Sequence, residues 1–184
     1  LDVVSKETLF SHYLYFSTVS RTIPTHFAAL AKEVATEHTQ KGDMVVEIGS
    51  NDGVLLRFFR EAGLRVLGVD PARAIAAEAT KQGIQTIPDF FDPALARRLR
   101  QEGWEADLIA ANNVFAHADD LHGIADGVAQ LLKPDGLFVF EVSYLLDVVE
   151  KTLFDTIYHE HLCYHTVKPL VGFFERHGME LIDA

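Results

Sequence analysis

The sequence predicts an α/β fold in which a doubly wound, mostly parallel sheet carries an N-terminal helical cover. From residue 43 onward, short apolar runs typical of buried strands alternate with helical stretches. Most of the helical stretches end just before a glycine, which commonly follows the last helical turn. Strands separated by single helices form right-handed βαβ units, and such units build a parallel sheet.

Each element follows from a local signal in the chain. Met44, Val45 and Val46 are apolar and partly β-branched, which indicates a buried strand, while Pro93 marks a helix start and Pro134 a turn. We expect strands over 43–48, 65–69, 84–87, 106–111, 137–142 and 179–182. We expect helices over 54–62, 72–82, 93–102, 121–132 and 169–177, and an earlier helix over 24–39 that covers the sheet.

Length and composition favour a single domain. The chain has 184 residues, 48% of them hydrophobic, which suits a packed core. Its 16 basic and 27 acidic residues give a net charge of −11, which disfavours nucleic acid and anionic membranes as partners. No apolar run reaches the ~18 residues that a membrane span requires. The single cysteine, Cys163, cannot form an internal disulfide and suits a reducing, cytoplasmic location.

No internal repeat or linker divides the chain. We therefore expect residues 1–184 to form one domain, with 1–42 as an N-terminal substrate and cover segment and 43–184 as the core. Because the chain begins at Leu1 rather than Met, we expect it to be excised from a longer chain.

The turn after the first strand has the features of a nucleotide-type binding site. Residues 47–53 read Glu-Ile-Gly-Ser-Asn-Asp-Gly. Glycines allow a tight turn that brings backbone N–H groups close to a ligand at a helix N-terminus. Asn51 stands where such turns often have a middle glycine, and Asn tolerates the left-handed backbone conformation better than most residues. Asp70 ends the second strand, where an acid can bind both hydroxyls of a ribose.

Acids in and beside the turn favour one kind of cofactor over another. A turn that binds a dinucleotide usually keeps Gly-x-Gly-x-x-Gly and has no acid within it. Glu47 at the strand end and Asp52 in the turn suit a cationic, phosphate-free cofactor with a sulfonium and an ammonium group. An ordinary solvated turn is the alternative interpretation.

The core, residues 43–184, resembles the class I S-adenosylmethionine-dependent methyltransferases, which have a Rossmann-like fold. The resemblance implies S-adenosyl-L-methionine as the cofactor and S-adenosyl-L-homocysteine as the product. It implies that the first turn contacts the methionine end of the cofactor through Glu47, Gly49, Asn51 and Gly53.

The same resemblance implies roles for the residues that follow the other strands. It implies that Asp70 holds the ribose, that Asp89 binds the adenine amino group and that Phe90 packs on the adenine face. Asn112 and Asn113 would line the pocket floor near the methyl group. Because Asn112 is not followed by Pro-Pro-Tyr, amino-methylation of DNA bases is disfavoured.

A second group of polar residues lies at 154–162, which read Phe-Asp-Thr-Ile-Tyr-His-Glu-His-Leu. Apolar residues at helical spacing predict a helical turn from which Tyr158 and His161 project together. An imidazole can take a proton near neutral pH, and a phenol can stabilise an enolate oxygen. Glu160 can orient a histidine or raise its basicity. These residue types suit the deprotonation of a carbon next to a ketone.

Two other interpretations of this segment stay open. If it is a strand, His159, His161 and a carboxylate share one face and can bind a metal, with help from His117 or His165. Alternatively, its histidines are hydrogen-bonded core residues or exposed residues without a function.

The combination of motifs resembles the sugar C-methyltransferases of deoxysugar biosynthesis, which methylate nucleotide-linked 4-keto-6-deoxyhexoses at C3. Tyr-His-Glu-His follows the fifth strand, and residues 13–20 are similar to that family's Tyr-x-Tyr-x-Ser-Ser-x-Ser segment. The resemblance implies that His161 is the base and that Tyr158 and Glu160 support it.

The resemblance also implies a substrate contact from the N-terminal segment through Tyr15, with Tyr13 as the second candidate. His117 and Tyr144, after the fourth and fifth strands, are candidates for lining the substrate pocket. The family carries a zinc-binding domain before this region and an α/β domain after it, so we expect both to be missing here and no metal in this chain.

These observations together predict an S-adenosylmethionine-dependent methyltransferase that C-methylates a nucleotide sugar through an enolate. A small-molecule O-methyltransferase that uses His161 on a hydroxyl is the alternative. A cofactor-binding module without chemistry and a dehydrogenase are weaker interpretations.

Overall fold

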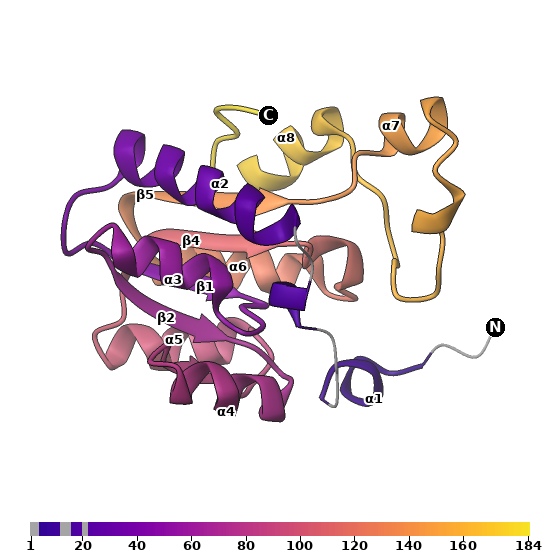
Figure 1. The fold of residues 1–184 in the computed structure, drawn as a ribbon. Helices are drawn as coiled ribbons and strands as arrows, with labels where there is room; N and C mark the ends of the chain where they lie inside the picture. The colour runs from indigo at the N-terminus through magenta and orange to yellow at the C-terminus, as the bar shows by residue number, and fades with distance from the viewer. Residues whose placement is uncertain (1–3, 12–15, 20–21) are drawn as a thin grey trace.

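Five parallel strands form the centre of the fold. The structure is a computed structural model that describes residues 4–11, 16–19 and 22–184. The strands are β1 (Met44–Ile48), β2 (Arg65–Val69), β3 (Thr86–Ile87), β4 (Ala106–Asn112) and β5 (Leu132–Glu141). They lie in the order β3-β2-β1-β4-β5, and every neighbouring pair is parallel (Figure 1). The predicted doubly wound sheet is confirmed.

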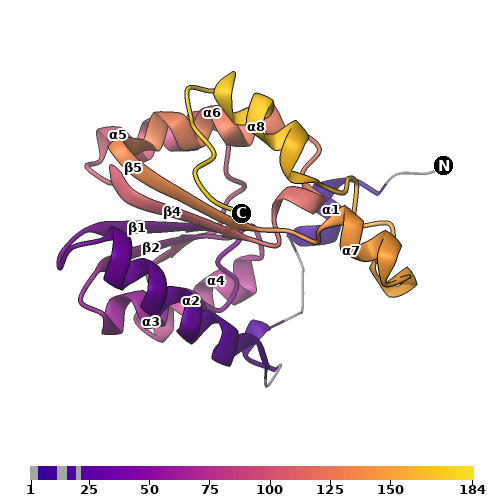
Figure 2. The same cartoon turned by 90° about the horizontal axis from the view of Figure 1, so that it is seen from above.

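Helices cover both faces of this sheet (Figure 2). One face carries α2 (Thr22–His38), α3 (Val54–Glu61) and α4 (Arg73–Lys81), and the other carries α5 (Pro93–Gln101), α6 (Leu121–Leu131) and α8 (Val167–Glu175). The short helices α1 (Lys6–Phe10) and α7 (Leu145–Glu150) lie beyond the carboxyl ends of the strands. Three 3-10 helices, η1 (Ser17–Val19), η2 (Phe115–His117) and η3 (Phe154–Thr156), lie in the connections. Helix α2, which packs on α3, is the predicted N-terminal cover.

Within the described part of the chain, no helix combines the length and the apolar character that crossing a lipid bilayer requires.

The central strand β1 is buried along its whole length. Its side chains alternate between the two faces, as in any strand. Met44, Val46 and Ile48 join the core cluster beneath α5, α6 and α8, whereas Val45 joins the cluster beneath α2 and α3. Glu47 points to the same face as Val45 and is only 3% exposed. A strand buried on both faces is normally apolar throughout, so this acid needs a functional explanation.

The order of the strands reverses at β1. From β1 the chain adds β2 and β3 on one side, and later adds β4 and β5 on the other. In doubly wound sheets such a reversal opens a crevice at the carboxyl ends of the strands, and ligands bind there. The connections at this end of the sheet gather near α1 (Figure 1).

The strand predicted over 179–182 is absent, which corrects the expectation from the sequence. Met179 donates its N–H to the carbonyl of Phe174 at 3.0 Å and packs against the core, while Ile182 is 68% exposed. Met179, the first apolar residue of the predicted strand, therefore closes the end of α8 instead.

Strand β5 also begins earlier than predicted, at Leu132 rather than at 137. Leu132 pairs with Ala106, but Leu137 already pairs with Leu108, so the predicted turn over 133–136 is an irregularity within the strand. Asp135 adopts a left-handed conformation with φ of 64°, which suits a turn residue.

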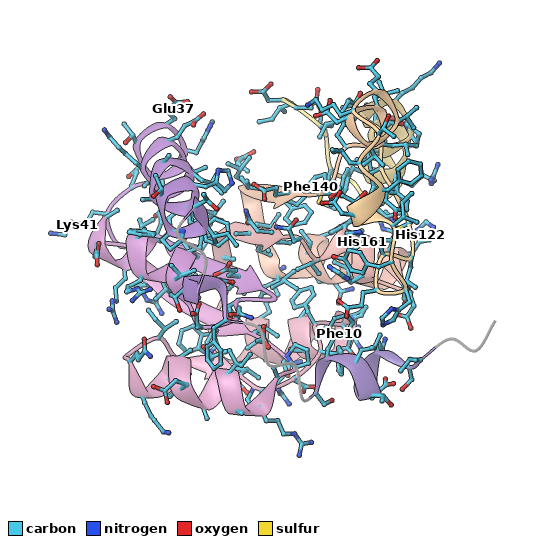
Figure 3. All side chains as sticks on the ribbon, turned by 45° about the vertical axis from the view of Figure 1, so that its right-hand side comes forward. Phe10, Glu37, Lys41, His122, Phe140 and His161 are labelled. Atoms are coloured by element: carbon cyan, nitrogen blue, oxygen red, sulfur yellow. The ribbon has the colours of Figure 1, made fainter. Side chains whose placement is uncertain are left out.

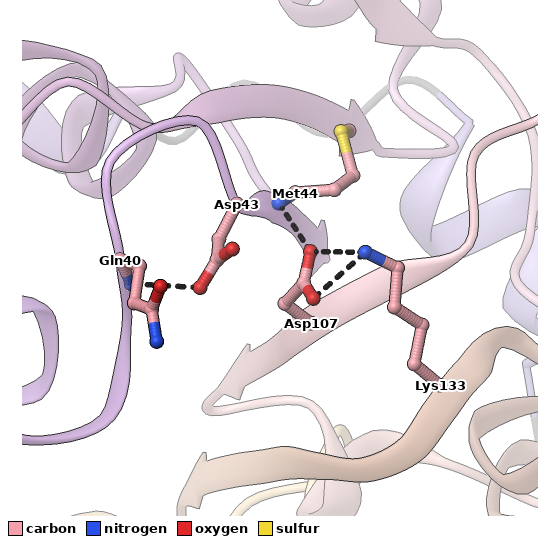
Figure 4. Close-up of polar contacts among 5 residues, drawn as sticks. All are labelled: Gln40, Asp43, Met44, Asp107 and Lys133. Atoms are coloured by element: carbon pink, nitrogen blue, oxygen red, sulfur yellow. Dashed lines mark hydrogen bonds and ion pairs between the residues drawn. The ribbon is translucent and has the colours of Figure 1, made fainter.

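Asp107 connects three strands at the amino end of the sheet. Its Oδ2 accepts a hydrogen bond from the Met44 N–H at 2.8 Å, and Lys133 Nζ lies 2.7 Å from both carboxylate oxygens (Figure 4). Partial burial raises the pKa of Asp107, but Lys133 and the Met44 N–H lower it by more, so that the pKa lies below its usual value. The stabilisation is therefore present above the ordinary aspartate pKa of ~3.9 and is lost as the pH falls through the folded-state pKa.

We expect Asp107→Asn to lower the free energy of unfolding by about 1 kcal/mol at pH 7, because an amide cannot form the charge-assisted bonds to Lys133. The difference from the wild-type domain should begin to shrink below the ordinary aspartate pKa of ~3.9 and disappear as the pH falls through the lower folded-state pKa of Asp107. Urea unfolding of both proteins at pH 7 and at a pH below ~3.9 measures the loss of stability and its dependence on pH. Lys133→Met should cost a similar amount, and the double variant should lose less than the sum of the two losses. Strictly additive losses would mean that the two side chains act independently.

Candidate functional site

A cavity of about 650 Å³ lies at the carboxyl ends of the strands. Residues from the connections after all five strands line it, together with residues from α1, α2 and the segment 155–161. Phe10 of α1 and His161 are two lining residues from distant parts of the chain (Figure 3). A pocket of this size can hold a drug-sized ligand.

The turn after β1 has a left-handed backbone at every second residue. Gly49 has φ of 69°, and a Cβ there would lie 2.7 Å from Val114 Cγ2. Asn51 has φ of 48°, so it adopts the conformation for which it is well suited. Gly53 has φ of 74° and is the N-cap of α3. These residues bring the backbone of the turn to the wall of the cavity.

Three buried carboxylates lie close together beneath this turn: those of Glu47, Asp52 and Asp70. Burial raises the pKa of Glu47 well above its usual value, and the charges of Asp70 and Asp52 add to the shift. Burial also raises the pKa of Asp70, against the opposing effect of hydrogen bonds from the backbone N–H groups of Ala72 and Asn51, each at 2.8 Å. A bound cation would stabilise the charged forms of these acids.

Several buried polar atoms at the site have no hydrogen-bond partner among the described residues. They are Glu47 Oε2, Ser50 Oγ, Asp52 Oδ1 and both amide atoms of Asn112. Buried polar groups in folded proteins are nearly always hydrogen-bonded, so this cluster marks a binding site. Acceptors beside a glycine-containing turn fit the ammonium group and ribose of S-adenosylmethionine.

The same turn holds the N-terminal segment against the core. Asn51 Oδ1 accepts a hydrogen bond from the Ser17 N–H at 2.9 Å. Asp52 Oδ2 accepts two from Thr18, one from its N–H at 3.1 Å and one from its hydroxyl at 2.5 Å. One oxygen of Asp52 is thus engaged by the protein itself. The two tyrosines expected to reach the substrate, Tyr15 and Tyr13, lie outside the described residues.

Asp89 and Phe90, the residues expected near adenine, both line the cavity after β3. Asp89 Oδ1 accepts a hydrogen bond from the Phe90 N–H at 2.9 Å, and Oδ2 lies 3.9 Å from Arg98 Nη2. Lys6 of α1 lies 5.6 Å from the centre of the Phe90 ring and 3.1 Å from Asp119 Oδ1. Helix α1 therefore borders the part of the cavity proposed for adenine.

Asn112 and Asn113 line the cavity where β4 ends. Asn112 pairs with Glu141 of β5 in the sheet register and is 8% exposed. Asn113 has φ of 57°, donates its N–H to the carbonyl of Glu141 at 2.8 Å, and donates Nδ2–H to Glu141 Oε1 at 3.2 Å. The ends of β4 and β5 thus present amide and carboxylate groups together.

His161 is hydrogen-bonded through both of its ring nitrogens. Nδ1 lies 2.8 Å from the carbonyl oxygen of Thr156, and Nε2 lies 2.9 Å from the hydroxyl of Tyr158. A carbonyl only accepts, so Nδ1 carries the proton, and Nε2 accepts from the phenol. Tyr164 also donates its hydroxyl to the Thr156 carbonyl, at 2.9 Å. The predicted meeting of Tyr158 and His161 is present, in a turn that follows η3.

His117 lies beside this pair and lines the same cavity. Its ring centre is 4.9 Å from that of His161, and Phe10 packs edge-on at 5.6 Å. Nδ1 donates to the backbone carbonyl of Glu160 at 3.0 Å. Burial lowers the pKa of His117 by more than this hydrogen bond raises it, and His161 lowers it further. His117 is therefore neutral at pH 7.

Two expectations about this region differ from the structure. Glu160 contacts a histidine through its backbone carbonyl, not through the carboxylate that the sequence suggested. Tyr144 does not line the cavity; it forms an isolated parallel bridge with His165. Residues 158–161 form a turn rather than the strand that the metal alternative requires, and no group of three His, Cys, Asp or Glu suited to a metal occurs among the described residues.

The sequence analysis missed one pair of cavity residues, His26 of α2 and Glu141 of β5. Their side chains are in direct hydrogen-bonding contact. Glu141 could have been identified from the sequence, because it is an acid at the end of an apolar strand. Glu47 stands in a similar place near the end of β1. No local pattern marks His26, because it meets Glu141 only through the packing of α2 across the sheet.

Known proteins resemble this chain in sequence and in fold. Residues 15–184 match a family described as "Methyltransferase domain". C-methyltransferase NovU from Streptomyces niveus is 40% identical over 184 residues, which cover 99% of this chain and 44% of that protein. Ubiquinone biosynthesis O-methyltransferase from Colwellia psychrerythraea is 21% identical over 176 residues, 88% of this chain and 71% of that protein. The crystal structure of a SAM-dependent methyltransferase from Archaeoglobus fulgidus has a TM-score of 0.67 at 16% identity, covering 84% of this chain and 68% of that one.

Fold and cavity thus define a Rossmann-like domain of class I that uses S-adenosylmethionine as its cofactor. Given the match over residues 15–184, the chain belongs to the methyltransferase domain family. It spans less than half of the length of NovU.

We expect Glu47→Gln to stabilise the cofactor-free domain and to weaken cofactor binding. The pKa of Glu47 is raised in the folded state, so the folded domain binds its proton more tightly than the unfolded chain does. The contribution of Glu47 to the free energy of unfolding therefore falls as the pH rises from its unfolded-state pKa of ~4.3 through its higher folded-state pKa. The variant should therefore gain about 1 kcal/mol in free energy of unfolding at pH 8. Its affinity for S-adenosylhomocysteine should fall about tenfold or more, because a charged acceptor is lost. Urea unfolding and calorimetric titration measure the two effects.

Glu61→Gln is the matched control, since Glu61 is an exposed acid in the last turn of α3. It should change neither quantity. A Glu47→Gln domain that is less stable than the wild type at pH 8 would mean that this acid supports the fold itself.

Proposed function

We propose that the protein containing this chain methylates a carbon next to the ketone of a nucleotide-linked 4-keto-6-deoxyhexose, with C3 as the expected position. The 40% identity to a protein named as a C-methyltransferase supports a carbon acceptor. The observation that carries the proposal is the hydrogen-bonded pair of His161 and Tyr158 at the wall of the cavity. An imidazole base beside a phenol suits proton removal next to a ketone.

His161 is the base in this proposal. The bond from its Nδ1–H to the Thr156 carbonyl selects the tautomer in which Nε2 has the free electron pair. Nε2 takes the proton from C3, and the electrons of the broken C–H bond form the enolate. Because the Nδ1–H is hydrogen-bonded to the backbone carbonyl of Thr156, the imidazole ring keeps its orientation when it gains a proton.

Tyr158 stabilises the enolate oxygen. Burial raises the pKa of its phenol, and Glu160 and Tyr164 raise it further, so the hydroxyl keeps its proton at neutral pH. That O–H donates to His161 Nε2 in the structure and would donate to the ketone oxygen once a sugar is bound. This exchange of partners leaves Nε2 available for the proton of C3.

His117 keeps the surroundings of the base free of positive charge. Its lowered pKa makes it neutral at pH 7, so it does not repel the charge that His161 gains. Its contact with Glu160 also fixes the turn that carries Tyr158 and His161.

The cofactor site supplies the other reactant. When bound, S-adenosylmethionine provides an electrophilic methyl group, and Glu47 and Asp70 are the residues that would hold it. Overall, one C–C bond would replace the C3–H bond of the sugar and the methyl–sulfur bond of the cofactor, S-adenosylhomocysteine would leave, and His161 would release the proton to water. Much of the acceleration would come from holding the two reacting carbons close together.

The charge of the cavity indicates which part of the substrate enters. Lys6 is the one Lys or Arg among the described lining residues, whereas acids line the cavity from several loops. A diphosphate would be repelled from such a lining, so the sugar ring enters and the nucleotide stays outside.

We expect His161→Asn to lower turnover by about 10³-fold, in the range lost when a general base is removed, and to leave the affinity for S-adenosylhomocysteine within about twofold. The full-length protein is incubated with a dTDP-4-keto-6-deoxyhexose in D₂O without cofactor. Proton NMR then follows deuterium entering the sugar. Exchange should disappear in His161→Asn and persist in His159→Asn, an exposed histidine two residues away.

Other results would change the proposal in defined ways. Loss of cofactor affinity together with turnover would give His161 a structural role. Exchange at C5, the other carbon next to the ketone, would keep the base and move the methylated position. Methylation of a hydroxyl without any enzyme-dependent exchange would favour the O-methyltransferase alternative.

A further inference from the structure

His26 and Glu141 form an imidazole–carboxylate pair that the mechanism above does not use. They are 115 residues apart in the chain and meet where α2 crosses the end of β5. His26 Nε2 contacts Glu141 Oε2, and Asn113 Nδ2 donates to Oε1 at 3.2 Å. A carboxylate only accepts hydrogen bonds, so the His26 N–H is the donor. Two donors from different elements therefore fix the orientation of this carboxylate.

The pair is accessible from the cavity. Both residues line it, and their side chains are 52% and 38% exposed. A polar pair with this exposure adds little to the stability of a fold. Each oxygen of Glu141 also retains a second lone pair, which can accept another hydrogen bond.

The order of the strands divides the cavity into two halves. Gly49 after β1, Asp70 after β2 and Phe90 after β3 belong to the half proposed for the cofactor. Strands β4 and β5 continue the sheet on the other side of β1. Glu141 ends β5, and His161 follows it in the chain, so both belong to the second half. A methyl acceptor therefore has its polar contacts on the side of Glu141.

A buried amide beside Glu141 lacks hydrogen-bond partners. Asn112 lies opposite Glu141 in the register of β4 and β5 and lines the cavity. It is 8% exposed, and neither its amide oxygen nor its amide nitrogen has a partner among the described residues. Buried polar side chains normally have one, so this amide is available to a ligand. A hydroxyl group fits both residues, since it can accept from an amide N–H and donate to a carboxylate.

We propose that Glu141 and Asn112 form a subsite that binds a hydroxyl group of the acceptor sugar. The inference rests on the proposed function and adds to it the contact that selects hydroxylated sugars. The hydroxyl donates to a Glu141 oxygen and accepts from the Asn112 amide. His26 does not touch the sugar; it is a positioning residue that holds the carboxylate.

The subsite distinguishes a hydroxylated sugar from a deoxy sugar through the hydrogen bonds that are lost when the hydroxyl is absent. A hydrogen bond to a charged group contributes about 10- to 100-fold in affinity. A site built around such a bond rejects an analogue without the hydroxyl, because its buried polar groups are then left unpaired.

The test measures kcat, KM for the sugar and KM for S-adenosylmethionine with the full-length protein. Glu141→Gln should raise the KM for the sugar about tenfold or more and leave the KM for S-adenosylmethionine within about twofold. His26→Gln should raise the sugar KM by a smaller factor, because it removes only the support of the carboxylate. Glu37→Gln is the matched control, since Glu37 lies 4.0 Å from His38 in an exposed pair on the same helix.

Deoxy analogues of the sugar identify the hydroxyl. With the wild-type protein, removal of the recognised hydroxyl should raise KM by about the same factor as Glu141→Gln. Combined, the two changes should have no greater effect than either alone, because they remove the same interaction. A thermal melt of each variant controls for folding.

Three results would overturn the inference. The sugar KM of Glu141→Gln could equal that of the wild type. Both KM values could rise together with a loss of thermal stability, as expected for a purely structural pair. The wild-type protein could use hydroxylated and deoxy sugars equally well. The wild-type protein tests the proposed function before any variant is made. If it binds S-adenosylhomocysteine but neither exchanges nor methylates the keto-sugar, both the proposed function and this inference are overturned.

Discussion

The burial of Glu47 in the central strand is the constraint on which the site depends. Strand β1 is covered on both faces, so a carboxylate near its end cannot reach bulk water. Asp52 and Asp70 add two more buried acids beneath the same turn, and like charges in a buried site oppose one another. The free protein thus carries an unfavourable electrostatic arrangement at the point where its sheet reverses. A cofactor with positive charge offsets that cost, which links the architecture of the sheet directly to the chemistry of methyl transfer.

The turn over these acids also connects the two ligands of the proposed reaction. Asn51 and Asp52 accept hydrogen bonds from Ser17 and Thr18, so a shift of the turn on cofactor binding would act on the N-terminal segment. That segment resembles the one that reaches the substrate in sugar C-methyltransferases. Sites that share a structural element influence each other's affinity reciprocally. The turn after β1 is therefore more than a binding loop, because it also holds Ser17 and Thr18 of the N-terminal segment in place.

Local patterns in the sequence determine the sheet and the backbone of the turn after β1, and these could be predicted. Apolar runs bounded by glycine located the strands, and the tolerance of Asn51 for a left-handed backbone agreed with its observed φ of 48°. Predictions that needed tertiary information were weaker. Glu160 lies near a histidine as expected, but the geometry of the turn decides that its carbonyl makes the contact. His26 reaches Glu141 only because α2 packs across the sheet, and Met179, which was predicted to begin a strand, instead bonds to the end of α8.

The two halves of the cavity are supported by different forces. The cofactor half is built largely on β1 and β2, whose apolar residues belong to the packed core. The segment that carries His161 leaves the sheet after β5, and Phe154 and Ile157 within it are 74% and 60% exposed. It is held largely by hydrogen bonds, such as that from the Leu162 N–H to the Ala116 carbonyl at 2.7 Å. Segments with few buried apolar contacts open at a low cost in free energy. The segment that carries His161 should therefore open at a lower cost in free energy than the cofactor half, which suits the proposed reaction, because there the sugar enters on the side of His161.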